Sequence, residues 1–454
     1  MIYNQQELLH MMRHYLILIL IWCSGVLSAQ ENLSLQEAIA IGLRNNYQVQ
    51  IAERNLEIAE NSNDWGLAGR YPLINATLNI NNNYNNNNNP ASFFPQIQSL
   101  SSAVVPGIDA TWTLYNGSRI RLTKQQLEEQ ERLGQSNLQI IVENTIQRII
   151  LAYYQALVQE EQLRVRAEVL RLSRDRLNYS NVRQEFGQAA TFDVLQSQDA
   201  YLNDSTSYLI QLNTHENALR DLNLAMGLDQ LDARYNLTDA LELEIQNYAL
   251  EDLKAQMISN NRTLQNLFIN REIARFGTRL EETRMLPAIN LRIGLTDNIG
   301  YNIFSTAVSV SGDERNFGGI RTNALNLFGG ITATHTLLDW GVRRRSIQNA
   351  RLREVTAQIG IEDQKRTLFT QLENTFATYN TQKQLVALTN QLVQNAQRSL
   401  NIAGERFDSG LINVFDYRTV QLSYISAIQS RLNAILNLKN TETEMLRLTG
   451  VLVR

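Results

Sequence analysis

The stretch PLINATLNI, residues 72–80, alternates apolar and polar side chains from Ile74 to its end. Ile74, Ala76 and Leu78 fall on one side of an extended chain, and asparagine and threonine fall on the other. The same alternation returns later as PAINLRIGL, residues 287–295. It predicts a β-strand with one apolar and one polar face, present in two copies.

The whole chain follows this duplication. LQEAIAIGLRNN (35–46) is matched by LEDLKAQMISNN (250–261), and IDATWTL (108–114) is matched by ITATHTL (331–337). Each copy predicts the same order: helix, strand, loop, strand, very long helix, break, helix. The spacing between the copies changes between the two strand-like pieces, where the asparagine tract NNNYNNNNNP (81–90) lies. We therefore expect this tract to be a hydrated loop outside the sheet.

The predicted boundaries follow from these matches. The first repeat is expected over residues 30–240, with strands at about 71–82 and 104–115, a long helix at about 118–186 and a helix at about 190–229. The second is expected over residues 241–454, with strands at about 286–299 and 321–338, a long helix at about 342–407 and a helix at about 413–450. None of the 5 prolines falls inside a predicted helix, where each would cost ~3 kcal/mol.

Residues 1–29 are predicted to be a secretory signal peptide. Arg13 and His14 precede a short apolar run, and Ala29 provides a small residue at a cleavage site. A retained membrane anchor is the alternative, but the run is too short to span a bilayer comfortably. The start could be Met1, Met11 or Met12. The single cysteine, Cys23, lies within this segment, so we expect no disulfide and no thiolate site in the mature chain.

Composition and motifs argue against several function classes. With 44% hydrophobic and 19% charged residues the chain is expected to fold, and a net charge of -4 gives no reason to expect nucleic acid. There is no HExxH, phosphate loop, G-x-S-x-G or Cys/His cluster, so we expect no enzyme, no cofactor and no metal site. His215 lies in a heptad-like row and is expected to be a packing residue.

Leucines also recur at seven-residue spacing in the predicted helices, as at Leu195, Leu202 and Leu209. A seven-residue period predicts left-handed supercoiling against neighbouring helices.

Four half-polar strands in an exported chain suggest a membrane sheet. Such strands can cross a bilayer if every edge is paired, but four cannot close a barrel, for which about eight is the smallest number. The chain must then borrow strands from copies of itself. Aromatic residues at the helix-side ends of the strands fit a membrane interface: Trp65, Tyr71, Tyr115 and Trp340. A soluble sandwich with aromatic core residues is the alternative.

This ordered set of features resembles the TolC-like outer membrane efflux proteins, the outer membrane factors. The resemblance covers almost the whole mature chain. It rests on the duplication, on the NN pairs at residues 45–46 and 260–261, on P-x-I-N at strand entry and on LDWGVRR (338–344). It also rests on FGQAATFDVLQSQ and FDSGLINVFDYRTVQ, which would be the tips of helical hairpins.

The resemblance implies a mostly α fold with membrane β. Each chain would give four strands to a trimeric 12-stranded β-barrel, continuous with a long α-helical coiled-coil barrel through the periplasm. It implies a homotrimer in outer membrane lipid that works passively with a periplasmic adaptor (membrane fusion protein) and an inner-membrane pump of RND or ABC type. The activity would be efflux or type I secretion, with the cargo left open. A surface-anchored coiled-coil adhesin or structural protein is the alternative, and the duplication argues against it.

By motif position, the resemblance also implies site residues. Asp193 and Asp416 match the acids that narrow and charge the pore entrance, although acids in a first helical turn can equally serve as caps. Gly187 and Gly410 mark the hairpin tips where the family meets its adaptor, or glycines required only by the turn.

The sequence departs from the best-known members at three entrance-gate positions. Phe407 and Ile412 stand where those members have a tyrosine and an arginine, and Thr419 stands where they have a second acid. A polar lock of that type cannot form from these side chains.

Overall fold

The structure is a computed structural model that describes residues 31–241, 245–315 and 318–452. The predicted signal peptide, residues 1–29, lies outside the described residues. Among the helices that are described, none is long and apolar enough to cross a membrane.

The chain folds into two compact units, and each unit takes segments from both sequence repeats. The helical unit contains the described residues up to Glu53, Leu138–Arg262 and Arg366 to the end. The sheet unit contains Arg54–Asn137 and Thr263–Lys365. The repeats are therefore interleaved in space, because each long helix begins in one unit and ends in the other.

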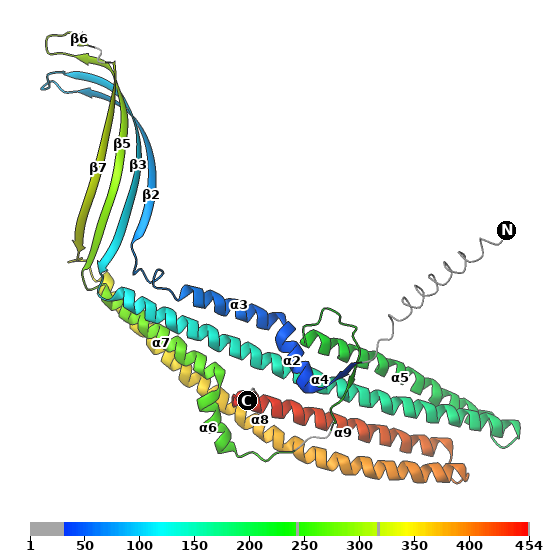
Figure 1. The fold of residues 1–454 in the computed structure, drawn as a ribbon. Helices are drawn as coiled ribbons and strands as arrows, with labels where there is room; N and C mark the ends of the chain where they lie inside the picture. Colours follow the sequence, from blue (N-terminus) through cyan, green and yellow to red (C-terminus); the bar gives the residue numbers. More distant parts are fainter. Residues whose placement is uncertain (1–30, 242–244, 316–317, 453–454) are drawn as a thin grey trace, which may run out of the picture. The chain divides into compact units, whose positions relative to one another are not determined.

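The sheet unit holds an antiparallel sheet in the order β2–β3–β5–β7 (Figure 1). Within the described residues, β2 pairs only with β3 and β7 only with β5, so each has an open edge. A two-residue strand, β6 (Glu314–Arg315), pairs with the end of β5. The four long strands are β2 (Leu73–Asn88), β3 (Gln96–Tyr115), β5 (Ala288–Val308) and β7 (Gly318–Thr334).

The asparagine tract is a strand, and its prediction as a loop was wrong. Asn81–Asn88 continues β2 and pairs residue by residue with the first half of β3, from Ala103 to Gln96. Only Asn89 and Pro90 belong to the turn, where the Asn89 N–H donates to the Pro95 carbonyl at 2.7 Å. Asparagine has a weak strand propensity, but the ladder bonds backbone groups, so pairing within a hairpin overrides that propensity.

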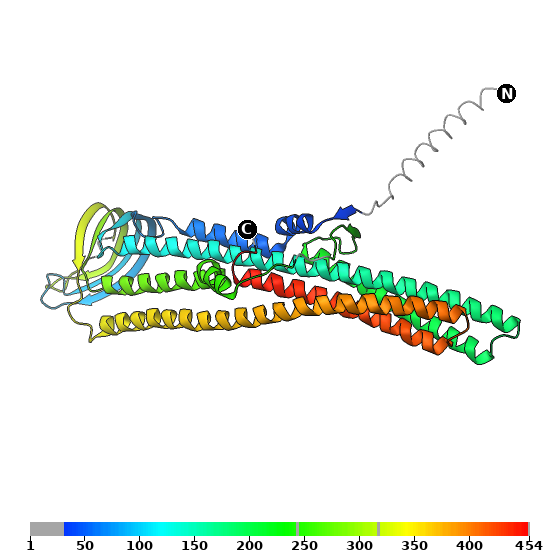
Figure 2. The same cartoon turned by 90° about the horizontal axis from the view of Figure 1, so that it is seen from below.

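In the part of the chain that the structure describes, eight helices complete the fold, and two hairpins of long helices dominate it (Figures 1 and 2). The first hairpin is formed by α4 (Arg119–Glu185) and α5 (Thr191–Ala225), and the second by α8 (Val342–Asp408) and α9 (Val414–Leu448). The shorter helices are α2 (Leu35–Asn45), α3 (Tyr47–Ser62), α6 (Leu250–Asn260) and α7 (Arg262–Thr283). Two short strands, β1 (Glu31–Leu33) and β4 (Tyr235–Leu237), pair in parallel.

The NN pairs form the same junction in both repeats. Asn46 donates from its amide to the Ala225 carbonyl at 3.1 Å, and Asn261 donates to the Leu448 carbonyl at 2.9 Å. In each repeat the glycine that follows the hairpin, Gly227 or Gly450, packs against the NN pair, which we call the asparagine corner. A Cβ on Gly227 would lie 2.7 Å from Asn46 Cα, and one on Gly450 would lie 2.4 Å from the Asn260 carbonyl oxygen. Each junction ties a short helix to the end of a hairpin.

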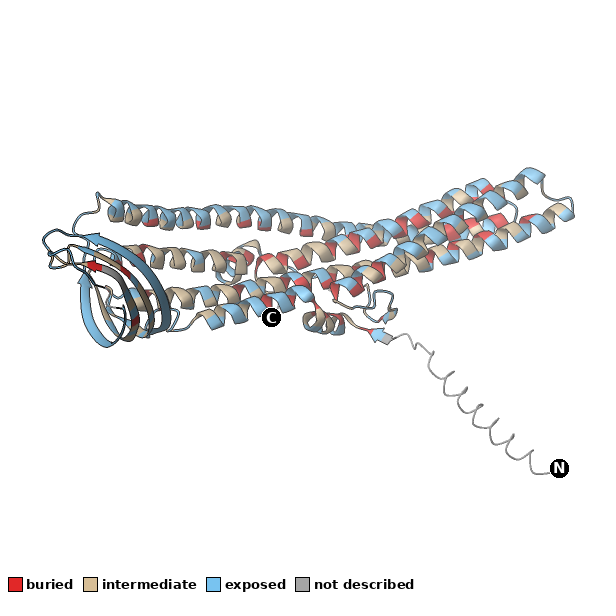
Figure 3. Cartoon of the chain, turned by 90° about the horizontal axis from the view of Figure 1, so that it is seen from above, coloured by how far each residue is buried: buried red, intermediate tan, exposed pale blue. Residues whose placement is uncertain are grey.

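The largest buried cluster lies in the helical unit, where α2, α4 and α5 meet. Tyr153 is completely buried there, and its hydroxyl donates to Asp239 at 2.6 Å and lies 2.8 Å from the Leu33 carbonyl. This side chain therefore fastens β1 and the segment after β4 onto α4. The edge strands β2 and β7, by contrast, are exposed along their whole length in the single chain (Figure 3).

Candidate functional site

The hairpin tips are two glycine turns with the same geometry. Gly187 has φ +71° and Gly410 has φ +72°, and a Cβ at either position would meet no atom within 4 Å. At the first tip, the Gln188 N–H donates to the Arg183 carbonyl at 2.8 Å, and the second tip repeats this bond. Glycine is needed here for the left-handed backbone, and the space around it is open.

The two predicted entrance acids lie in the first turn after each tip. Asp193 accepts the Ala190 N–H at 3.2 Å and so takes part in capping α5. Asp416 is exposed, and its own N–H donates to the Asn413 side chain at 2.9 Å, so Asn413 is the cap of α9. The carboxylate of Asp416 is thus left to solvent, whereas that of Asp193 has a structural bond.

The predicted gate positions lie in and beside an apolar cluster of the second hairpin. Phe407 is 5% exposed and packs with Leu400, Val414 and Tyr417, and Ile412 covers this cluster. Thr419 is exposed, and its hydroxyl donates to the backbone of its own helix at 3.1 Å.

A partly buried arginine of the first hairpin reaches into this cluster. The guanidinium carbon of Arg176 lies 3.3 Å from the ring centroid of Tyr417 and 4.7 Å from that of Phe407. Tyr179 adds an edge contact to Phe407, with centroids 6.1 Å apart. Burial lowers the pKa of Arg176, and the two ring faces compensate part of the lost hydration. The sequence analysis missed this contact.

A second connection between the hairpins is a buried ion pair. Arg418 of α9 donates two hydrogen bonds to Asp204 of α5, each 2.6 Å long, and a third to Gln421 at 2.8 Å. Asp204 is 3% exposed and also accepts a bond from the Ser173 hydroxyl of α4. The bidentate geometry satisfies both carboxylate oxygens, as a buried charge requires.

The seven-residue leucine spacing pointed to a different face of α5 from the one that is buried. The row Leu195, Leu202 and Leu209 was predicted to pack, yet these side chains are 53 to 62% exposed in the single chain. Ser197 and Asp204, which are also seven residues apart, are buried against α4 instead. The leucine row therefore remains available to another chain.

The sheet has one apolar face across all four strands. Neighbouring residues in register form apolar rows, among them Ala76–Ile108–Leu295–Leu327 and Ile80–Val104–Ile299. From Leu291 to Ile299 these rows extend roughly 27 Å along β5, at about 3.4 Å per residue. We call this face the apolar belt; Asp297 interrupts it near its end. The opposite face is polar, with Asp109 and Arg292 paired at 3.4 Å.

The predicted interface aromatics lie at the ends of the strands that join the helices. Tyr71 precedes β2, Tyr115 ends β3 and Trp340 follows β7, and these three are 60, 42 and 82% exposed. Trp65 follows α3 and is half-buried, with the guanidinium of Arg70 4.8 Å from its ring centroid.

The corner at Trp340 is held by one ion pair. Asp339 accepts the side chain of Arg343 at 2.7 Å, its backbone N–H at 3.0 Å and the Gly341 N–H at 3.1 Å. These bonds, led by the one from the Arg343 side chain, lower the pKa of Asp339 to about 2. Arg343 also donates to the Thr336 carbonyl at 2.6 Å. Trp340 is held with φ +53°, a left-handed conformation that is rare for a large side chain.

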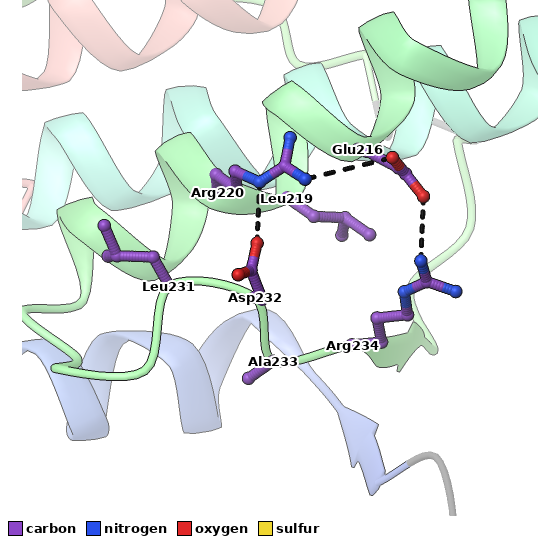
Figure 4. A pocket seen from close by; sticks show the side chains of 7 residues that line it. All are labelled: Glu216, Leu219, Arg220, Leu231, Asp232, Ala233 and Arg234. Carbon is purple, nitrogen blue, oxygen red and sulfur yellow. Dashed lines mark hydrogen bonds and ion pairs between the residues drawn. The ribbon is translucent and has the colours of Figure 1, made fainter.

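A small pocket of about 190 Å³ lies between α5 and the segment that follows it (Figure 4). Arg220 pairs with Asp232 at 2.7 Å, and Arg234 pairs with Glu216 at 2.8 Å. Each charge has a partner, so the network holds this segment against the helix. His215 on the same helix is half-buried, and burial lowers its pKa.

Residues 253–451 match the family model described as "Outer membrane efflux protein". Over these residues the chain is similar to that family. The resemblance expected from the sequence is confirmed. A comparison with curated protein sequences found no match.

Solved structures share the fold over 92% of this chain. The CmeC outer membrane channel of Campylobacter jejuni has 15% sequence identity and a TM-score of 0.72, with 86% of its own chain covered. The outer membrane protein VceC of Vibrio cholerae has 13% identity and a TM-score of 0.70, with 96% covered. The MtrE outer membrane channel of Neisseria gonorrhoeae, in its open state, has 17% identity and a TM-score of 0.66, with 89% covered.

Proposed function

We propose that this chain is the subunit of a passive, trimeric exit duct in the outer membrane. The duct serves a tripartite efflux or type I secretion system, and its helical hairpins form a tunnel through the periplasm. A periplasmic adaptor and an inner-membrane pump of RND or ABC type are its partners. The pump supplies the energy, and the duct supplies the path.

The open edges of β2 and β7 carry this proposal. A sheet that crosses a bilayer must pair every backbone N–H and C=O, because each unpaired group costs several kcal/mol in lipid. Joining β2 of one copy to β7 of the next removes both open edges. Three copies then close a barrel of 12 strands, with the apolar belt outward and the Asp109–Arg292 face inward.

The mass of the detergent-extracted mature protein tests this assembly. Light scattering with the detergent contribution subtracted is expected to give three chains per particle. Two chains would indicate an eight-stranded barrel instead. A stable monomer would leave the open edges in lipid and would contradict the duct.

Within the duct, we propose that Asp193 and Asp416 line the periplasmic entrance. Three copies of two carboxylates around a narrow axis would favour cations. The double change Asp193→Asn with Asp416→Asn should therefore reduce cation preference in single-channel recordings. The control is Asp175→Asn, an exposed acid of α4 in an ordinary surface pair. Unchanged ion selectivity would leave the two acids with a capping role only.

The adhesin alternative makes a different cellular prediction. Deletion of the gene is expected to cause drug hypersensitivity or failed secretion if the chain is a duct. Lost attachment with an intact export profile would favour the adhesin. The strand pairs interrupt the helices at equivalent points of both repeats, which favours the duct.

A further inference from the structure

We propose that the apolar face of the sheet continues, past the end of the apolar belt, into a surface that binds the saccharide headgroups of outer-leaflet glycolipid, with Tyr301 and Arg321 as its centre. This inference rests on the proposed function, because it requires the belt to lie in the outer membrane.

The register places this surface directly beyond the belt. The last row of the belt is Ile80–Val104–Ile299, which ends on the polar Asn323 of β7, and the row two residues further along each strand is Asn82–Ser102–Tyr301–Arg321. Because side chains alternate between faces, both rows lie on the same face of the sheet. In an inserted barrel, this second row would lie where hydrocarbon ends and headgroups begin.

Tyr301 forms a platform on this row. Its hydroxyl and outer ring atoms occupy the space over Gly319 of the neighbouring strand, where a Cβ would lie 2.0 Å from the hydroxyl oxygen. The ring therefore lies across β7 instead of standing away from the sheet, and it is still 49% exposed. An aromatic ring that lies on a glycine gives a broad, rigid surface with a polar hydroxyl at its end.

The row that holds the platform is polar, whereas the row beyond it also contains two exposed aliphatic side chains, Leu100 and Ile303. Arg321 is the cross-strand partner of Tyr301 on β7, and Ser102 is its partner on β3. The following row contains Tyr84, which is 64% exposed, between Asn82 and Asn86 on the same face. The asparagine tract thus gives this surface a series of amide groups.

This combination of groups fits a phosphorylated saccharide. Aromatic surfaces pack against the C–H groups of a sugar ring, and amides both donate to and accept from hydroxyl groups. Arg321 supplies a bidentate donor for a phosphate. A phospholipid headgroup layer would need the arginine but would leave the amides and the two tyrosines without a role.

The test measures which lipids accompany the protein. The mature chain is reconstituted into phosphatidylcholine vesicles that contain either lipopolysaccharide with its core saccharide or phosphatidylglycerol at equal negative charge. Protease protection first establishes insertion. The protein is then extracted in polymer-bounded discs, and mass spectrometry compares the lipid ratio in the discs with that of the vesicles.

Lipopolysaccharide is expected to be enriched around the native protein. Tyr301→Ala should lower that enrichment by about two- to tenfold, the size expected for the loss of one aromatic contact, and Arg321→Ala should also lower it. Tyr301→Phe keeps the ring and should retain most of the enrichment. Asn302→Ala, at the same height on the opposite face, is the matched control and should have no effect.

Phosphatidylglycerol could instead be enriched as strongly as lipopolysaccharide, with only Arg321→Ala removing the enrichment. The surface would then be a charge contact only, and the saccharide assignment would be overturned. Equal enrichment in native and Tyr301→Ala proteins would also overturn it. If the chain is inserted in these cases, the duct proposal stands. Failure to insert into either vesicle would refute the membrane belt and this surface together.

Discussion

Asp204 and Arg418 are 214 positions apart in the sequence, yet they form a bidentate ion pair with two bonds of 2.6 Å. Asp204 belongs to the first repeat and Arg418 to the second, so the pair joins the two hairpins. We propose that, in a duct, this pair takes the place of the polar lock that Phe407 and Ile412 cannot make. The entrance of the proposed duct would therefore be held closed by buried contacts between hairpins.

Breaking this pair should destabilise the protein and loosen the entrance. Arg418→Ala leaves the Asp204 carboxylate buried without its charge partner, which typically costs ~3–5 kcal/mol. Urea unfolding of the native and variant proteins measures the loss, and single-channel recording should show a larger conductance. Arg171→Ala is the control, because its pair with Asp175 is exposed and such pairs contribute about 0–1 kcal/mol. Equal effects of the two changes would contradict a special role for Asp204–Arg418.

Alanine at the junction glycines should be far more costly than alanine at the tip glycines. Gly227 and Gly187 have the same φ, +71°, so both changes place alanine in a strained backbone at about 1–2 kcal/mol. Only at Gly227 does the Cβ also meet backbone, 2.7 Å from Asn46 Cα. Thermal unfolding should therefore separate Gly227→Ala from Gly187→Ala by at least about 1 kcal/mol.

The same comparison is available in the second repeat, with Gly450 and Gly410. If the junction and tip variants unfold at the same temperature in both repeats, close packing against the asparagine corner is not the reason for glycine at the junctions.

The partly buried Arg176 should gain more stabilisation from Tyr417 than from Phe407. Its guanidinium carbon is 3.3 Å from the first ring centroid and 4.7 Å from the second. Tyr417→Leu is therefore expected to lower the free energy of unfolding by about 1–2 kcal/mol more than Phe407→Leu does. Adding Arg176→Met to each variant completes a double-mutant cycle, which measures the coupling to each ring. Similar coupling energies would show that the rings act only as apolar packing.

The corner at Trp340 should lose stability in acid through Asp339. A free aspartate has a pKa of about 3.9, and in the fold the bonds from Arg343 and Gly341 lower it to about 2. A lowered pKa means that this group stabilises the fold above about pH 4 and that the contribution is lost as the pH falls through about 2. Unfolding midpoints of native and Asp339→Asn proteins should therefore differ at pH 5 and converge toward pH 2. A constant difference over this range would refute the assignment.

Local pattern predicted the elements of this fold well, because it depends on near neighbours. Alternation at residues 72–80 marked a strand, and long segments without proline marked helices. It failed at Asn81–Asn88, where the partner strand β3 supplies the hydrogen bonds that asparagine's own propensity does not favour. The contacts of the candidate site were harder to predict, because Arg176 and Arg418 contact side chains of another helix. No spacing within one segment reports such a contact.

The sequence by itself determined the duplication, the two faces of the strands, the glycine turns at the tips and the family. Each of these depends on periodicity, on left-handed backbone or on motifs that neighbouring residues encode. Only the tertiary structure decided the interleaving of the repeats, the Asp204–Arg418 pair and the cover of Gly319 by Tyr301. These depend on which surfaces meet after the chain has folded back on itself, and buried charges and close approaches acquire their energy only there.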